Sequence, residues 1–242
     1  MTTATDISAL IAARRARRAL ALDEIGGKKL LAMAGIAIPK GVLVKRVADV
    51  NDALSGLAFP VVVKVVSPDI LHKSDAGGVK VNLCSLNEVQ HAIEIMMDTP
   101  AIQKAKLDGF LIEEMATPGQ EIVVGAVQDA QFGPMIMVGL GGIFVEVLGD
   151  VSFRICPISP LDAREMLEDL KCVAILNGAR GREAVSKSAI IEVLLKIGGE
   201  DGLLMRYPDE FSEIDINPLI VSNSGAVAVD ARFILTQRDD AR

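Results

Sequence analysis

The sequence predicts an α+β fold in two lobes rather than a doubly wound parallel sheet. Strand-like and helix-like segments are interleaved along its 242 residues, without the regular β-α alternation of a doubly wound sheet. Half of the residues are hydrophobic, so the chain can bury a substantial core, either as one large domain or as two lobes. Neither a short-period repeat nor a low-complexity linker is visible.

Each expected element in the first half of the chain has a local signal. A helix over 23–33 ends before Gly35, a residue that favours a helix C-terminus. The run FPVVVKVV at 59–66 has the length and apolar character of a buried strand. Ser85 and Glu88 have the spacing of a capping box, which begins a helix reaching residue 98. The other elements expected here are an Ala/Arg-rich helix over 1–20, a helix over 48–55, and strands over 41–44, 78–83 and 109–113.

The second half of the chain continues the same mixture. Ser159 and Pro160 mark a clear helix start, because serine caps a helix N-terminus and proline fits its first position. A longer helix is expected over 182–197. The expected strands are 121–127, 134–138, 212–216 and 226–229, the last two being joined by a hairpin turn at 223–225.

Composition and charge exclude several classes of function. A formal net charge of −7 argues against general nucleic-acid binding. No apolar run is long enough to span a membrane, and the arginine-rich stretch at 14–18 lacks the apolar core of a secretory signal. That stretch is typical of a solvated helix face, with docking on a partner as the alternative. The cysteines at 84, 156 and 172 are scattered and lack metal-ligand spacing, so a cytoplasmic location is expected.

Lys64 stands out inside an otherwise apolar strand. A lysine in this position costs free energy unless its ammonium group finds a partner or reaches water. One interpretation is an edge-strand lysine that reaches solvent, and the other is an ammonium group that binds nucleotide phosphates. Gly77 and Gly78 in the following loop favour the second, because glycine lets backbone N–H groups approach an anion closely. No Walker A motif is present.

Asn217 and Asp230 lie at the ends of the two C-terminal strands. Antiparallel pairing of these strands brings the two residues beside each other. An amide oxygen and a carboxylate suit Mg²⁺, which takes only one or two protein ligands together with waters and phosphate oxygens. The alternative is an ordinary hairpin, in which Asn-Pro begins a turn and the aspartate caps it.

Two further features are open to two interpretations each. Glu113 and Glu121, on either side of ATPG, can face one binding site from two strands or can be surface charges. The glycines of GLGG at 139–142 can bring backbone close to a ligand or can make a tight bend. Only the order of all these features along the chain makes them specific.

The chain resembles the ATP-grasp subunit of ADP-forming acyl-CoA synthetases and, more distantly, the β subunit of succinyl-CoA synthetase. The segments that carry the resemblance are, in order, PVVVKVVSPDILHKSDAGGV, GFLIEEMATPGQEIVVG, GLGGIFVEVLGDVSFRICPIS, EIDINPLIV and AVDAR. The resemblance implies the ATP-grasp fold, in which two α+β lobes clamp a nucleotide. The expected divisions are a basic helical extension over 1–22, an N-terminal lobe over 23–115 and a C-terminal lobe over 116–242.

The resemblance also implies roles for individual residues. Lys64 looks like the phosphate-binding lysine of the family, with Gly77 and Gly78 in the loop beside it. Asn217 and Asp230 look like the two magnesium ligands. The remaining residues expected to bind the nucleotide are Glu113 and Met115 at the adenine, Glu121 at the ribose and Arg154 at the phosphates.

His72 matches the histidine that accepts a phosphoryl group in the acyl-CoA synthetase branch of the family. A neutral imidazole nitrogen is a competent nucleophile near neutral pH. The implied reaction is acyl-CoA + ADP + phosphate ⇌ carboxylic acid + CoA + ATP, through an acyl phosphate and a phosphohistidine carried on a partner. The resemblance therefore implies ATP or ADP, Mg²⁺ and a CoA-binding α subunit in an α2β2 heterotetramer. The alternatives are a stand-alone ATP-grasp carboxylate ligase and a non-catalytic nucleotide-sensing subunit.

Overall fold

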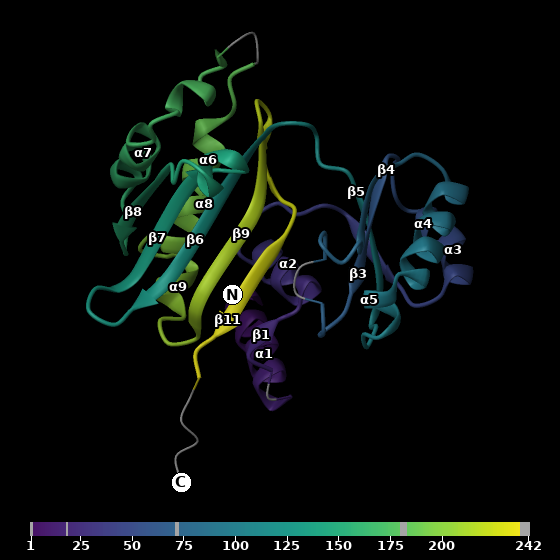
Figure 1. Cartoon of the computed structure of the whole chain (residues 1–242). Coiled ribbons are helices and arrows are strands. Elements are labelled where there is room, and N and C mark those ends of the chain that lie inside the picture. The colour runs from purple at the N-terminus through teal and green to yellow at the C-terminus, as the bar shows by residue number, and fades with distance from the viewer. Residues whose placement is uncertain (1, 18, 71–72, 180–182, 238–242) are drawn as a thin grey trace. The chain divides into compact units, whose positions relative to one another are not determined.

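The computed structural model describes residues 2–17, 19–70, 73–179 and 183–237 and divides the chain into two units (Figure 1). One unit is Pro39–Ala116, and the other combines Met1–Ile38 with Thr117–Arg242. Each unit has its own antiparallel sheet and its own hydrophobic core. The expected α+β fold class is therefore confirmed.

The Pro39–Ala116 unit is built on a four-stranded sheet in the order β2-β5-β3-β4. Strand β3 (Val61–Val66) is buried along its whole length, as its uninterrupted apolar run predicts. Alternate valines of β3 join a core with side chains of three helices. The expected helix start at Ser85 is present, because its hydroxyl accepts the N–H of Glu88. The other elements are β2 (Gly41–Val44), η1 (Val47–Asp49), α3 (Val50–Leu54), β4 (Val79–Leu83), α4 (Leu86–Asp98), α5 (Pro100–Gln103) and β5 (Gly109–Glu114).

The larger unit is built on a seven-stranded sheet in the order β1-β11-β9-β6-β7-β8, with β10 paired to β9. The helix start expected at Ser159 is present and forms a capping box, with Asp162 as its partner. The helix expected over 182–197 begins instead at Lys187, although residue 182 itself lies outside the described residues. The elements are α1 (Thr2–Ala16), β1 (Ala21–Leu22), α2 (Glu24–Met33), β6 (Gln120–Asp129), β7 (Gly133–Leu140), α6 (Ile143–Glu146), β8 (Val151–Ile155), α7 (Pro160–Glu168), η2 (Val173–Ile175), α8 (Lys187–Gly198), α9 (Leu203–Arg206), β9 (Phe211–Ser222), β10 (Gly225–Ala228) and β11 (Ala231–Leu235).

The two faces of this larger sheet differ. On one face, Ala126, Ile136 and Ile214 are register partners across three strands and are buried in the core. Helices α7, α8 and α9 lie behind this part of the sheet in the view of Figure 1 and cover that face. On the opposite face, α6 packs at one end, where a Cβ on Gly139 would lie 2.9 Å from the Val145 side chain. We call this second side the open face.

The first 38 residues require a correction to the expected divisions. Strand β1 pairs with β11 through Ala21↔Ile234 and Leu22↔Phe233, so this segment belongs to the larger unit. Ile7 and Ile11 of α1 are buried in the core of that unit. Residues 1–22 are therefore not an appended extension, and residues 23–38 are not part of the Pro39–Ala116 unit. The physical reason is the apolar side of α1 and α2, which is buried against the sheet.

Candidate functional site

Lys64 and Glu113 form a buried ion pair on the neighbouring strands β3 and β5. The Lys64 Nζ atom lies 3.1 Å from Glu113 Oε2, and the two side chains are 6% and 2% exposed. Because β3 has a strand on each side, Lys64 is not an edge residue. A buried ion pair adds little net stability compared with apolar residues of similar size. Its presence therefore favours a functional interpretation of Lys64.

The loop after β3 contains the other residues predicted at the phosphates. His72 lies outside the described residues, so its role stays a prediction. Gly77 has a φ of +71°, in the left-handed region that favours glycine. The Gly78 N–H donates to the Lys73 carbonyl oxygen at 2.7 Å, and a Cβ on Gly78 would lie 2.3 Å from a methyl group of Val65. The backbone conformation at Gly77 and the close packing at Gly78 thus explain why glycine occupies both positions, whether or not the loop binds an anion.

Met115, the predicted backbone contact of the adenine, follows directly after β5. Its N–H donates to the Pro60 carbonyl oxygen at 3.0 Å, and the Glu114 N–H donates to the Lys40 carbonyl oxygen at 2.9 Å. Because the Met115 N–H already has an acceptor, a nucleotide contact through this residue has to use its carbonyl oxygen or its side chain.

Glu121 lies near the start of β6, in the larger unit, whereas Glu113 belongs to the smaller one. The Glu121 carbonyl oxygen accepts the Gly141 N–H at 2.8 Å, and a Cβ on Gly141 would lie 2.8 Å from Glu121 Cβ. The GLGG segment therefore approaches the backbone of Glu121 closely, which only glycine permits at position 141. The Glu121 side chain itself is exposed.

Asn217 and Asp230 lie beside each other, as the hairpin pattern predicts. The register between β6 and β9 shifts at this point, and Asp230 occupies the break between β10 and β11. The Asn217 N–H donates to the Asp230 carbonyl oxygen at 3.2 Å, and the Val229 N–H donates to the Pro218 carbonyl oxygen at 3.0 Å. The backbone thus places an amide side chain and a carboxylate on adjacent chain segments.

Asp215, two residues before Asn217, belongs to the same region and was not predicted. It pairs in register with Gly125 on one side and Arg232 on the other. Burial, followed by the charges of Glu213 and Asp230, raises the pKa of the Asp215 carboxyl, while Arg232 acts in the opposite direction. Side chains two apart on a strand share a face, and this spacing is the signal that could have identified Asp215 from the sequence.

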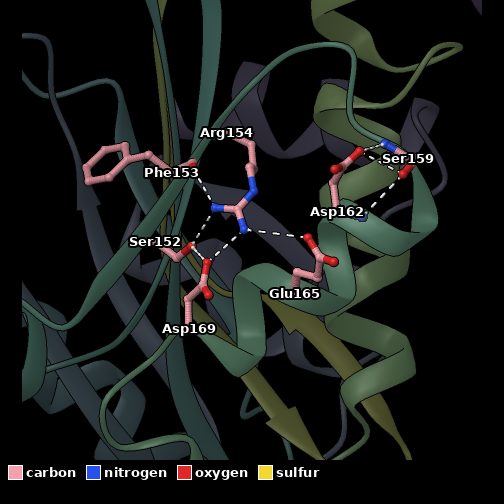
Figure 2. A network of polar contacts seen from close by, with 7 residues as sticks. All are labelled: Ser152, Phe153, Arg154, Ser159, Asp162, Glu165 and Asp169. Carbon is pink, nitrogen blue, oxygen red and sulfur yellow. Dashed lines mark hydrogen bonds and ion pairs between the residues drawn. The ribbon is translucent and has the colours of Figure 1, made fainter.

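Arg154 lies apart from these residues, on the helix-covered face of the sheet. It pairs in register with Ile136, a residue of the buried core. Figure 2 shows its guanidinium group beside Asp169 and Glu165, with distances of 2.7 Å from Arg154 Nη2 to Asp169 Oδ2 and 3.9 Å to Glu165 Oε2. The hydrogen bond from Arg154 holds the pKa of the Asp169 carboxyl below its usual range. The structure therefore does not bring Arg154 together with Glu121 or Asn217.

The donor set limits which metal this region can hold. Among the residues that the structure describes, no three His, Cys, Asp or Glu side chains form a group that could hold a metal ion. Asn217 and Asp230 suit a hard cation whose other ligands are waters or phosphate oxygens.

None of the described helices is long and apolar enough to cross a membrane, and Cys84, Cys156 and Cys172 are unpaired.

Two α+β units, one with a buried lysine and the other with an Asn–Asp pair on a hairpin, fit the two-lobed ATP-grasp fold. A family model described as an ATP-grasp domain matches residues 12–235 of the chain. Among curated proteins, the β subunit of ADP-forming acetate–CoA ligase I from Pyrococcus furiosus is 42% identical over 216 residues, which cover 88% of this chain and 91% of the relative. ADP-forming acetate–CoA ligase I from Archaeoglobus fulgidus is 41% identical over 211 residues, covering 86% of this chain but 30% of that longer protein.

Solved structures agree with this result. Acetyl-coenzyme A synthetase 1 from Candidatus Korarchaeum cryptofilum, in complex with coenzyme A, Ca-AMPCP and HgCl+, has a TM-score of 0.88 at 38% identity and covers 93% of this chain and 98% of its own. Another complex from that organism contains coenzyme A and Mg-AMPPCP, with a phosphohistidine segment pointing towards the nucleotide-binding site (TM-score 0.81, 37% identity, 95% and 99% coverage). The chain therefore belongs to the ATP-grasp family, together with ADP-forming acetate–CoA ligases. This confirms the family expected from the ordered motifs.

Proposed function

We propose that this chain is the nucleotide-binding β subunit of an ADP-forming acyl-CoA synthetase. It catalyses Mg²⁺-dependent phosphoryl transfer between ADP or ATP and a phosphohistidine relay, in the overall reaction acyl-CoA + ADP + phosphate ⇌ carboxylic acid + CoA + ATP. The observation that carries the proposal is the match over nearly the whole length of a separate β subunit of such an enzyme. The relative with Mg-AMPPCP and a phosphohistidine segment supports the same chemistry.

Lys64 binds phosphate in this proposal. Phosphoryl transfer depends mainly on positioning and on neutralising negative charge, rather than on covalent chemistry by the protein. An ammonium group that is only 6% exposed interacts with a phosphate in an environment where solvent screens charges weakly. Glu113 fixes the position of this ammonium group through the ion pair at 3.1 Å. Gly77 and Gly78 shape the loop that carries His72.

The base and the sugar are bound by other residues. The Met115 carbonyl oxygen can accept a hydrogen bond from the adenine amino group, and the exposed carboxylate of Glu121 can accept hydrogen bonds from ribose hydroxyls. The phosphate contact expected for Arg154 is not part of the proposal, because its guanidinium group is paired with Asp169 on the helix-covered face.

Asn217 and Asp230 fit the role of magnesium ligands. Their oxygen donors are of the type that Mg²⁺ prefers, and two protein ligands leave room for waters and phosphate oxygens. The backbone hydrogen bond between the two residues keeps their positions on the chain together. When bound, Mg²⁺ neutralises phosphate charge and orients the transferred group.

The rest of the reaction requires a partner. The chain matches 91% of a relative that is named as a separate β subunit and 30% of a longer single-chain ligase, and the first of these matches supports a partner polypeptide for the remaining part of the enzyme. We infer that this partner is a CoA-binding α subunit in an α2β2 assembly in the cytoplasm. His72 then exchanges the phosphoryl group between the nucleotide and the phosphohistidine segment of that subunit.

Isothermal titration of the chain with ADP and ATP tests the proposal directly. We expect binding that requires Mg²⁺, is lost with EDTA, and is weakened by Asp230→Asn but not by the exposed control Asp201→Asn. We expect His72→Asn to keep nucleotide binding and to lose turnover with the CoA-binding subunit. No binding in the presence of Mg²⁺ contradicts the proposal.

Two other outcomes identify the alternatives. If the chain alone joins a carboxylate to an amine and His72→Ala keeps full activity, it is a stand-alone ligase. If it binds nucleotide but never carries acid-labile, base-stable phosphate, it is a sensing subunit.

A further inference from the structure

The open face of the larger sheet carries a group of apolar side chains that the core does not use. Val127, Met135, Met137, Phe153 and Ile155 come from the three adjacent strands β6, β7 and β8, and we call them the open-face patch. Phe153 pairs in register with Met137, Ile155 pairs with Met135, and Met135 pairs with Val127. Register partners in an antiparallel sheet share a face, so the five side chains form one continuous surface.

Three of these side chains are too exposed to be part of the folded core, and Met135 and Met137 are partly exposed. Phe153 is 50% exposed, Ile155 51% and Val127 45%, although alternate residues on the same strands are buried. Exposed apolar residues that occur singly need no explanation, whereas a contiguous group on one sheet face marks an interaction surface. Helix α6 packs at the other end of this face, near Gly139, whereas Val127, Phe153 and Ile155 are exposed.

The patch continues across the sheet to the predicted magnesium ligands. One row of register partners runs from Phe153 through Met137 and Gly125 to Asp215. The Met137 Cε atom lies 3.1 Å from the position of a Cβ on Gly125, so the methionine covers the gap that the glycine leaves in this row. Asn217 follows two residues after Asp215, which corresponds to about 7 Å along a strand. An occupant of the patch therefore lies on the sheet face that carries Asp215, with Gly125 between Met137 and Asp215.

The surroundings of the patch define the chemistry of its occupant. Asp129 follows two residues after Val127 on β6, and Glu213 pairs with Val127 from β9. Carboxylates thus border the apolar side chains at β6. A complementary surface has apolar side chains at its centre and lysine or arginine beside them.

We propose that the open-face patch is the docking surface for the CoA-binding subunit, at the point where its phosphohistidine segment approaches the nucleotide. This inference rests on the proposed function, because it assigns a surface to the partner that the reaction requires. A second copy of this chain is a poorer occupant, since it would place another subunit beside Asn217 and obstruct the approach of that segment.

The test uses the full chain and the CoA-binding subunit that gives CoA-dependent ADP formation with it. Phe153→Ser combined with Ile155→Ser removes apolar contacts on β8, and Val127→Lys places a cation on β6 where the partner's own basic residues are expected. The matched control is Leu161→Ser on α7, because Leu161 is 59% exposed but lies outside the patch. The measurement is the dissociation constant of the two subunits by biolayer interferometry, with Mg²⁺-dependent ADP binding by each variant alone as a check of folding.

We expect both patch variants to weaken subunit association by about tenfold or more, as loss of central interface residues does. Leu161→Ser should leave it unchanged, and all three variants should bind ADP like the parent chain. Patch variants that bind the subunit as tightly as the parent chain overturn the inference and leave the proposed function intact. The inference is also overturned if the variants abolish a homodimer without weakening association with the subunit. If no CoA-binding subunit gives turnover with the parent chain, the proposed function fails and this inference fails with it.

Discussion

Lys64 has two roles: its ammonium group pairs with the Glu113 carboxylate and, in the proposed function, binds phosphate. A single substitution cannot separate these roles. Removing the lysine takes away the cation that lies 3.1 Å from a carboxylate only 2% exposed, and breaking such a pair costs about 3–5 kcal/mol. Replacing both partners by neutral residues removes this penalty, so a double variant distinguishes the structural role from the functional one.

We therefore expect Lys64→Met to lower the free energy of unfolding by about 3 kcal/mol or more, and Lys64→Met with Glu113→Gln to recover most of that loss. Both variants should bind Mg-ADP more weakly than the parent chain, because the phosphate-binding cation is absent from both. Urea unfolding and calorimetric titration measure the two properties, with the exposed Lys80→Met as the control. Normal ADP affinity in the double variant would show that Lys64 serves only the fold.

Asp215 gives a pH-dependent prediction. Its pKa is raised in the folded protein, first by burial and then by Glu213 and Asp230. The folded state therefore holds this proton more tightly than the unfolded state, in which an aspartate has a pKa of about 3.9. The stabilising contribution is fully present below that value and is lost as the pH rises through the folded-state pKa.

Asp215→Asn, which carries no charge, should consequently have a higher melting temperature than the parent chain at pH 7. The difference should shrink as the pH falls through the raised folded-state pKa and should be absent below about 4, where the parent aspartate is protonated in both states. Calorimetric scans from pH 3 to pH 7 measure this, with Asp201→Asn as an exposed control. A difference between Asp215→Asn and the parent that does not vary with pH would contradict the assignment.

Sequence reasoning succeeded at residues whose neighbours are close in the chain. The hairpin pattern was sufficient to bring Asn217 beside Asp230, because both lie within one short antiparallel segment. Arg154 could not be placed in the same way. Its position on the helix-covered face follows from the register of β8 on β7, which depends on contacts between distant residues.

The hairpin of β3 and β4 depends on a glycine at its base. A Cβ on Gly78 would lie 2.3 Å from Val65 Cγ1 and 3.2 Å from the Lys73 carbonyl oxygen, so the strand or the loop must shift to accept it. We expect Gly78→Ala to lower the free energy of unfolding by about 1–3 kcal/mol, the usual cost of overpacking. Urea unfolding measures this. Gly56→Ala is the matched control, because a Cβ there meets nothing within 4 Å, and equal losses from the two substitutions would contradict the packing argument.

The Arg154–Asp169 ion pair joins strand β8 to the C-terminal end of helix α7. If this contact is the role of Arg154, its loss should affect stability and leave nucleotide binding unchanged. The lowered pKa of Asp169 means that its contribution to stability is present at neutral pH and is lost as the pH falls through the folded-state value. We expect Arg154→Gln to melt at a slightly lower temperature than the parent at pH 7 and to bind Mg-ADP with unchanged affinity. A marked loss of ADP affinity would instead support the phosphate contact expected from the resemblance.

The elements that the sequence did not predict are those that depend most on tertiary pairing. Strand β3 is an apolar run and was expected, whereas β1 has only two residues and exists through its pairing with β11. Strands β8 and β11 were also missed, because each mixes buried and exposed residues over only five positions. Strand β9 is longer than expected, since its second half pairs with β10 beyond the irregularity at Asn217-Pro218.

At the scale of the whole molecule, the chain contains two cores that share no buried residue. The N-terminal segment contributes to the larger of them through Ile7 and Ile11, which are 0% and 2% exposed. Arg15 strengthens this attachment, with its Nη2 atom 2.7 Å from Glu210 Oε2 and its Nη1 atom 2.9 Å from the Thr236 carbonyl oxygen. The arginine-rich stretch is thus partly a structural contact and not solely a solvated helix face.

Because the two cores are separate, loss of packing in one should not propagate to the other. We expect Ile11→Ala to destabilise the larger unit by about 2–5 kcal/mol, the usual cost of truncating a buried isoleucine, and to lower hydrogen-exchange protection in β11 and β1. Protection in β3 and β5 should stay at the level of the parent chain, and the exposed Arg17→Ala should change neither region. Hydrogen-exchange mass spectrometry resolves the two sets of strands. Equal loss of protection in β3 would mean that the units unfold together and that residues 1–38 support the whole molecule rather than one core.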